Sequence, residues 1–208
     1  MPASPSRPAV TTRPATLADV PALAALHAET LPGDVSDFTP LGTAVVRRFY
    51  ANAIERGLAS VCVAPAEGLL VGFAMLTTDV AALFPRALLA GPADILRFLL
   101  TANPIGLARA AFAKLSSGTA AVAAVPELVY IAVSPRARGT GAGAALVEAV
   151  HEAFRAQGIA AYELNVHASN RAATSLYLSR GYEITRRYAK SGHEMYTMRR
   201  RVEPRERS

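Results

Sequence analysis

The sequence predicts an α+β fold with a mixed central β-sheet flanked by helices, and two observations lead to this prediction. Two helical patterns precede two strand patterns, and the second half of the chain reads strand, helix, strand, helix, strand, strand. The chain has 208 residues, of which 51% are hydrophobic, which is enough for a sizeable core within one domain. We expect that domain over residues 10–200, after a disordered Pro- and Ser-rich arm at 1–9 and before a basic tail at 201–208.

The first half of the chain is expected to begin with a short strand and two helices. Thr16 is the expected cap of the first helix, because Asp19 stands at the three-residue spacing of a capping box. The expected elements are a strand at 10–13, helices at 16–30 and 41–56 on either side of a loop at 31–40, and strands at 60–64 and 70–77 joined by a turn at Glu67-Gly68.

Residues 79–125 interrupt this order with apolar segments that are separated by Gly-Pro and Asn-Pro pairs. Short helices are expected at 81–89, 93–100 and 106–115, which makes the segment a helical insertion between the third and fourth strands. We interpret it as packing on the domain or on a second copy of the chain, so a homodimer is one alternative. A lid over an acceptor pocket and a membrane-surface patch are two others, and the few charges of the segment support the membrane interpretation only weakly.

The second half alternates strands and helices around a glycine-rich turn. The helix after that turn carries an apolar stripe of Leu146, Val150, Ala153 and Phe154. The expected elements are a strand at 127–133, a helix at 144–157 closed by Gly158, a strand at 161–166, a helix at 171–180 capped by Ser169 or Asn170 and ended by Gly181, and strands at 182–188 and 194–199.

Cysteine and histidine usage argues against a metal site. The single cysteine, Cys62, lies in an apolar run and is interpreted as a core residue, and one cysteine excludes a disulfide framework. His151, His167 and His193 show no metal-ligand spacing, so no metal is expected. The sequence shows neither a signal-peptide core nor an uninterrupted apolar run of about 18 residues, so we expect no membrane span and a cytoplasmic protein.

The formal net charge of +6 is concentrated at the two ends of the chain. Residues 186–208 hold eight Lys and Arg and three Glu, whereas residues 15–185 hold twelve basic and thirteen acidic residues. Arg199-Arg200-Arg201, together with Arg205 and Arg207, is interpreted as a solvated tail. A weak contact with nucleic acid or an acidic partner is the minority interpretation, and no nucleic-acid partner is expected.

Residues 138–143 follow an apolar strand and open a helix, which predicts a site for a phosphate-bearing cofactor. Backbone N–H groups at a helix start lack intrahelical partners, and glycines let a ligand approach the backbone closely. No lysine stands where a nucleotide-hydrolysing P-loop requires one. Residues 139–144 fit the dinucleotide fingerprint G-x-G-x-x-A. However, residues 134–138 intervene after the strand, and only 65 residues follow Gly143, too few for a doubly wound sheet.

Two motifs together resemble the GNAT superfamily of acyl-CoA N-acyltransferases. They are Arg138-x-x-Gly141-x-Gly143 and, at the usual distance downstream, Asn170-x-x-Ala173-x-x-Leu176-Tyr177-x-x-x-Gly181-Tyr182. Both lie within residues 127–188, and the order of the elements before them also fits, whereas the insertion at 79–125 departs from the common pattern. The resemblance implies a GNAT-like mixed sheet, with acetyl-CoA as the co-substrate.

The resemblance also implies which residues bind the cofactor. The expected set is the main chain of Ile131, Ala132 and Val133, the loop residues Arg138, Gly139, Thr140, Gly141, Ala142 and Gly143, and Asn170 and Tyr177 on the second motif. The family pattern implies that strand 127–133 splays from strand 161–166, so that unpaired N–H groups polarise the thioester carbonyl. Tyr177 is the expected acid, because a phenol stays protonated at neutral pH and can protonate a departing thiolate.

Glu127 is the expected general base, because members of the family often have a glutamate here that acts through water. Strand alternation is expected to put Glu127 on the face that holds Val129, Ile131 and Val133. Other polar candidates are His27, interpreted as a core or boundary residue, and Asp34 and Asp37, interpreted as turn residues.

These expectations predict an N-acetyltransferase that moves an acetyl group from acetyl-CoA to a primary amine, with a small molecule as the acceptor. Direct attack in a ternary complex is expected, because no cysteine lies in the cofactor motifs to form an acyl-enzyme. The alternatives are a peptide or protein amine as the acceptor, and a catalytically silent module that binds acyl-CoA and regulates a partner.

Overall fold

Seven strands in the described part of the chain form one mixed sheet, in the order β1-β2-β3-β4-β5-β7-β6. The structure is a computed structural model, and it describes residues 10–31, 33, 36, 39–66, 68–88, 125–190 and 192–203. The strands are β1 (Arg13–Pro14), β2 (Ser60–Ala66), β3 (Leu69–Thr77), β4 (Glu127–Val133), β5 (Ala161–His167), β6 (Glu183–Lys190) and β7 (His193–Arg201). Neighbouring strands pair antiparallel except β4 and β5, which are parallel, so the predicted α+β fold with a mixed sheet is confirmed.

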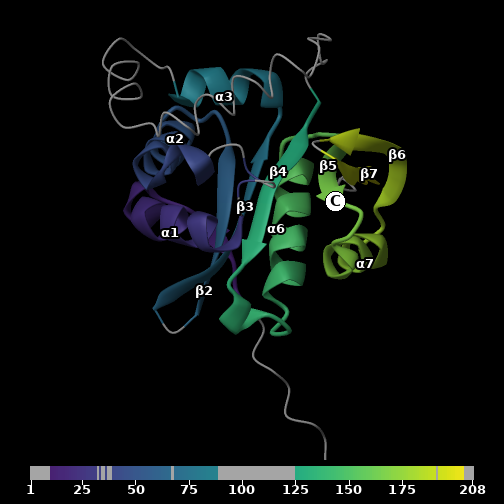
Figure 1. Cartoon of the computed structure of the whole chain (residues 1–208), viewed down its shortest axis with the longest axis horizontal. Helices are drawn as coiled ribbons and strands as arrows, with labels where there is room; N and C mark the ends of the chain where they lie inside the picture. Colours follow the sequence, from purple (N-terminus) through teal and green to yellow (C-terminus); the bar gives the residue numbers. More distant parts are fainter. Residues whose placement is uncertain are drawn as a thin grey trace, which may run out of the picture.

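Helices cover both faces of the sheet (Figure 1). They are α1 (Val20–Thr30), α2 (Thr43–Glu55), α3 (Val80–Leu88), α6 (Ala142–Ala156) and α7 (Arg171–Ser179). The first three pack on one face of the sheet, in a cluster that includes Phe49 and Phe73. The last two pack on the opposite face, in a cluster that includes Phe154 and Tyr162. A ligand that touches both helical layers must therefore reach through the sheet.

The sheet is open between β4 and β5. The two strands share a single register pair, Glu127 with Glu163, and beyond this pair they separate. On its other edge, β4 stays paired with β3 as far as Val133. The expected splay of these two strands is therefore present, and it leaves one edge of β4 without a strand partner.

A β-bulge at Val129 changes the side-chain pattern of β4. Tyr130 pairs with Met75 and Leu128 pairs with Leu76, so Val129 is an extra residue in β4. Leu128 consequently packs in the same cluster as Ile131, whereas Val129 and Tyr130 pack on the opposite face. The regular alternation predicted for the start of this strand is therefore wrong.

Most predicted elements are present with shifted ends. The strand predicted at 127–133 is β4, but the helix after the glycine turn begins at Ala142, because Gly141 is its N-cap. The first strand is at Arg13–Pro14 instead of 10–13.

The interpretation of Arg199–Arg201 as a solvated tail is wrong, because these residues belong to β7 and Arg200 donates a hydrogen bond to Glu148 over 3.4 Å.

Three predicted segments lie wholly or partly outside the described residues. They are the arm at 1–9, the insertion from 89 to 124 and the end of the chain at 204–208. Helix α3 is the described beginning of the insertion. No helix in the described ranges is long and apolar enough to cross a membrane.

Candidate active site

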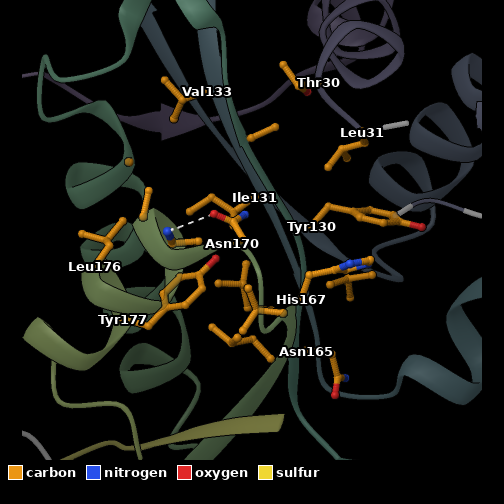
Figure 2. A pocket seen from close by; sticks show the side chains of 18 of the residues that line it. Thr30, Leu31, Tyr130, Ile131, Val133, Asn165, His167, Asn170, Leu176 and Tyr177 are labelled. Carbon is orange, nitrogen blue, oxygen red and sulfur yellow. Dashed lines mark hydrogen bonds between the residues drawn. The ribbon is translucent and has the colours of Figure 1, made fainter. Parts of the chain in front are cut away.

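A cavity of about 940 Å³ lies where β4 and β5 separate. Arg138 and Tyr177 line it on the side of α6 and α7, and Leu31 and Phe84 line it on the side of α1 and α3. Figure 2 shows Tyr130 and Ile131 pointing in opposite directions from β4. The cavity therefore reaches both faces of the sheet through the opening.

The glycine loop forms one end of the cavity. Gly139 and Gly141 have φ angles of 73° and 94°, in the left-handed region that favours glycine, and added Cβ atoms there would point into open space. No side chain caps α6, and the N–H groups of residues 142–144 have no backbone partner among the described residues. Three free N–H groups, the helix dipole and the exposed Arg138 side chain together make this end suitable for an anion.

Two loop residues differ in how they contribute to this end. The hydroxyl of Thr140 donates to the carbonyl of Ala137 over 2.7 Å, and Thr140 is not among the residues that line the cavity. Gly143 does line it, and a Cβ there would lie 3.4 Å from Leu176 Cδ2 on α7. Gly143 thus leaves room beside the Leu176 side chain of α7, whereas Thr140 stabilises the turn through its hydrogen bond to Ala137.

The free edge of β4 supplies hydrogen-bond donors to the middle of the cavity. The N–H of Ser134 donates to Val71 on β3 over 2.8 Å. Because N–H directions alternate along a strand, those of Val133 and Ile131 point the other way, toward β5. β5 has separated from β4 at this level, so these two N–H groups face the cavity, while that of Ala132 faces β3.

Helix α7 brings Asn170 and Tyr177 to the same cavity. Asn170 is the N-cap of α7, since its Oδ1 accepts from the N–H of Ala173 over 3.1 Å. Tyr177 is buried, and Figure 2 shows its hydroxyl pointing into the cavity. Burial raises the pKa of the Tyr177 hydroxyl above its usual value, so this phenol stays protonated at neutral pH.

Glu127 lies at the other end of the opening, but not on the predicted face. It pairs with Thr77 on the N-terminal side of the bulge, so it lies on the face of Val129 and Tyr130, opposite Ile131 and Val133. Its carboxylate is half-buried and accepts a hydrogen bond from Asn165 over 3.1 Å. Burial raises the pKa of Glu127, and the Asn165 hydrogen bond opposes that rise.

Of the remaining polar candidates, His27 lies in the core, and the two aspartates of the loop at 31–40 lie outside the described residues. His27 is fully buried, and its ring nitrogens lie 2.8 Å from the hydroxyls of Tyr50 and Ser36, so its interpretation as a core residue is confirmed. Burial lowers the pKa of His27 to about 4. Asp34 and Asp37 lie outside the described residues.

The other histidines do not form a metal centre in the described part of the chain. His151 is buried in the core, and the rings of His167 and His193 lie 5.0 Å apart. Within the described ranges, no group of three or more His, Cys, Asp or Glu side chains could hold a metal ion.

The structure adds three polar residues that the sequence analysis missed. Asn165 on β5 and Tyr188 and Lys190 on β6 line the cavity beside Glu127. The only sequence signal for Asn165 was its position as a polar residue between the buried Leu164 and Val166. Any solvent-facing position of a strand shows the same pattern, so this signal did not single out Asn165. Tyr188 and Lys190 come from a strand far along the chain, so no local motif could have indicated them.

Comparison with known proteins bears on the family and the fold. The family model described as the acetyltransferase (GNAT) family matches residues 23–182. No curated protein matches the chain.

Three solved structures illustrate the likeness. The ribosomal-protein-alanine N-acetyltransferase from Brucella melitensis is 21% identical with a TM-score of 0.60, and the match covers 93% of this chain and 100% of that one. An N-acetyltransferase from Staphylococcus aureus Mu50 is 15% identical with a TM-score of 0.63, covering 94% and 99%. The Salmonella typhimurium protein yncA, solved with its cofactor acetyl-CoA, is 15% identical with a TM-score of 0.61, covering 96% and 98%. At these identities, the structural likeness shows a shared fold.

Proposed function

The chain belongs to the acetyltransferase (GNAT) family, and from this premise we propose that it transfers an acetyl group from acetyl-CoA to the primary amine of a small molecule. Acetyl-CoA-dependent acyl transfer is the activity of the family, and the choice of acceptor is our proposal. The observation that carries it is one cavity that joins an anion-binding helix start to a half-buried carboxylate through the opened sheet.

The residues of the cavity suit acetyl-CoA. The free N–H groups at residues 142–144 and the guanidinium of Arg138 would hold the pyrophosphate. Open space at Gly139 and Gly141 leaves the backbone accessible to the phosphates. When bound, acetyl-CoA supplies the acetyl group as an activated thioester.

Three groups of this chain then perform the steps of the transfer: stabilisation of the acyl oxygen, removal of a proton from the amine and protonation of the departing sulfur. The N–H groups of Ile131 and Val133 are positioned to donate to the acyl oxygen and to stabilise the negative charge that develops on it. Glu127 accepts a proton from the acceptor ammonium, directly or through water. Tyr177 holds a proton at its hydroxyl and delivers it to the departing sulfur, in line with direct attack in a ternary complex.

The acceptor end of the cavity favours an amine on an apolar body. Its walls include the buried Leu31 and Met195 and the half-buried Val80, Phe84 and Tyr130. Among the described residues, the charged side chains at this end are Glu127 and Lys190. One carboxylate suits one ammonium, whereas a polyamine would bring further positive charges against apolar walls.

An amine panel tests this proposal. Phenethylamine and hexylamine, spermidine, glucosamine and short peptides that begin with alanine are incubated with the protein and acetyl-CoA, and thiol release is followed. The apolar amines are expected to give the highest kcat/KM. Phe84→Ala should lower that value about fivefold, as expected for the loss of apolar contacts.

Each other outcome of the panel has a definite meaning. Faster turnover of the alanine peptides would replace the small-molecule acceptor with a peptide amine, the acceptor named for the Brucella melitensis protein. Calorimetric binding of acetyl-CoA without turnover of any amine would favour the silent regulatory module.

A further inference from the structure

A network of side chains crosses the gap between β4 and β5 at the point where their backbones separate. Asn165 lies two residues beyond the Glu127–Glu163 pair, on the same face of β5 as Glu163. Its Nδ2 donates to Glu127 Oε1 over 3.1 Å. A side-chain bridge thus replaces the missing backbone ladder at this level.

Two hydroxyl groups fix the orientation of the Asn165 amide. Tyr188 on β6 and Thr197 on β7 donate to Asn165 Oδ1 over 3.0 Å and 2.9 Å. Thr197 Oγ1 itself accepts from Nε of Arg186 over 3.4 Å, so the Thr197 proton is directed at Asn165. With Oδ1 engaged twice as an acceptor, the amide can only present its N–H groups to Glu127.

We propose that Asn165 is a positioning residue for the acetyl transfer, which holds the Glu127 carboxylate by Oε1 and leaves Oε2 to accept the proton of the acceptor amine. This inference rests on the proposed function. No described residue donates a hydrogen bond to Oε2, and the carboxylate borders the cavity. A carboxylate fixed through one oxygen presents the other in a constant direction, which a general base requires.

The pKa of Glu127 depends on burial, on the Asn165 hydrogen bond and on two nearby charges. Burial is the largest influence on the pKa of Glu127 and raises it; Glu163 on β5 also raises it, and Lys190 on β6 lowers it. Tyr188 also faces Glu127: burial raises the pKa of this tyrosine, Arg186 opposes the rise, and the Glu127 carboxylate adds to it. The Asn165 hydrogen bond favours the ionised carboxylate, so its loss should raise the pKa of Glu127.

Two nearly isosteric variants separate positioning from structural support. Asn165→Leu removes the donor and both accepted bonds. Asn165→Asp keeps an acceptor for Tyr188 and Thr197 but replaces the donor with a second carboxylate. Because Asn165 is exposed, both variants should fold. If Asn165 only supports the structure, Asn165→Asp should behave more like the native protein than Asn165→Leu does. If Asn165 positions Glu127, Asn165→Asp should raise the pKa of Glu127 more than Asn165→Leu does.

The test is the pKa of the Glu127 carboxyl, measured by carbon-detected NMR and assigned with Glu127→Gln, together with kcat as a function of pH. We expect this pKa and the acid limb of kcat to rise by about one unit in Asn165→Leu and by more in Asn165→Asp, with acetyl-CoA affinity unchanged. An unchanged pKa in both variants, or a native acid limb in Asn165→Asp, would overturn the proposal. If the NMR values shift in this order while no amine is acetylated, the acetyl-transfer assignment fails and the Asn165–Glu127 contact stands.

Discussion

Tyr177 is the residue whose substitution tests the proposed proton delivery separately from cofactor binding. Its hydroxyl reaches the cavity, and burial keeps it protonated. Tyr177→Phe removes that proton and leaves the ring packing intact, so kcat is expected to fall about a hundredfold. The affinity for acetyl-CoA should change little. Steady-state kinetics and calorimetry on the two proteins check both parts.

Tyr162 offers a matched control for this substitution. Its hydroxyl lies 2.7 Å from that of Tyr182 in the core and is outside the cavity lining. Tyr162→Phe should therefore cost about 1 kcal/mol of unfolding free energy and leave kcat unchanged. Equal kcat losses in the two variants would mean that Tyr177 acts through packing and not as an acid.

His27 is expected to make the stability depend on pH. Burial lowers its pKa from 6.5 to about 4 in the folded protein, so between these values the unfolded chain binds more protons than the folded one. The stabilisation from neutral His27 is fully present above pH 6.5 and is lost as the pH falls toward 4, by about 3 kcal/mol. Urea unfolding across this range should show a flatter pH dependence for His27→Gln; an identical slope would contradict the assignment.

Single residues differ in how far the sequence could identify them. Asn170 and Tyr177 lie in one helix seven residues apart, so a local motif was enough to predict that they line one site. Asn165 depends on Tyr188 and Thr197, which come from two later strands. These contacts exist only once the β6–β7 hairpin is paired with β5, and no local pattern encodes them.

The glycine turn before α6 is the element whose conformation the proposed cofactor site requires. Gly141→Ala forces a Cβ onto a residue with a φ angle of 94°, which should cost about 1 kcal/mol of stability. Relief of that strain turns the first N–H groups of α6 away from the anion. We expect the affinity for acetyl-CoA to fall about tenfold, measured by calorimetry.

Gly158 at the other end of α6 is the control for this element. It also has a positive φ angle, 70°, an added Cβ there would meet nothing within 4 Å, and it does not line the cavity. Gly158→Ala should therefore cause a similar loss of stability with unchanged cofactor affinity. If both variants bind acetyl-CoA equally well, the geometry of the turn is not what holds the phosphates.

The elements also show where sequence patterns stop being informative. β4 was predicted with the correct ends, because its apolar run is bounded by a proline before it and by the turn after it. The bulge at Val129 was not predictable, since it results from the register with β3 and not from the residues of β4 alone. This one residue moved Glu127 to the opposite face, so the face predicted for its side chain was wrong.

At the scale of the whole molecule, the open sheet explains why the site lies between two separate cores. One core packs α1, α2 and α3 on the first half of the sheet, and the other packs α6 and α7 on the opposite face. β4 contributes Tyr130 to one core and Ile131 to the other (Figure 2). The cavity therefore lies between the two cores, and under the proposed function the cofactor would occupy its α6–α7 side and the acceptor its α1–α3 side, with the free edge of β4 between them.

The C-terminal end tests whether the basic residues belong to the fold or to a separate function. Val202 is buried, and its N–H donates to Ala160 over 2.9 Å, so β7 and Val202 close the second core. Truncation after Met198 should remove about 2 kcal/mol of apolar burial along with the last β5–β7 pairs, lowering Tm by about 5 °C or more. Truncation after Glu203 removes Arg205 and Arg207 and should leave Tm, acetyl-CoA affinity and kcat unchanged. A loss of activity in the second truncation at unchanged Tm would show that these arginines contribute to binding, and would revive the acidic-partner interpretation.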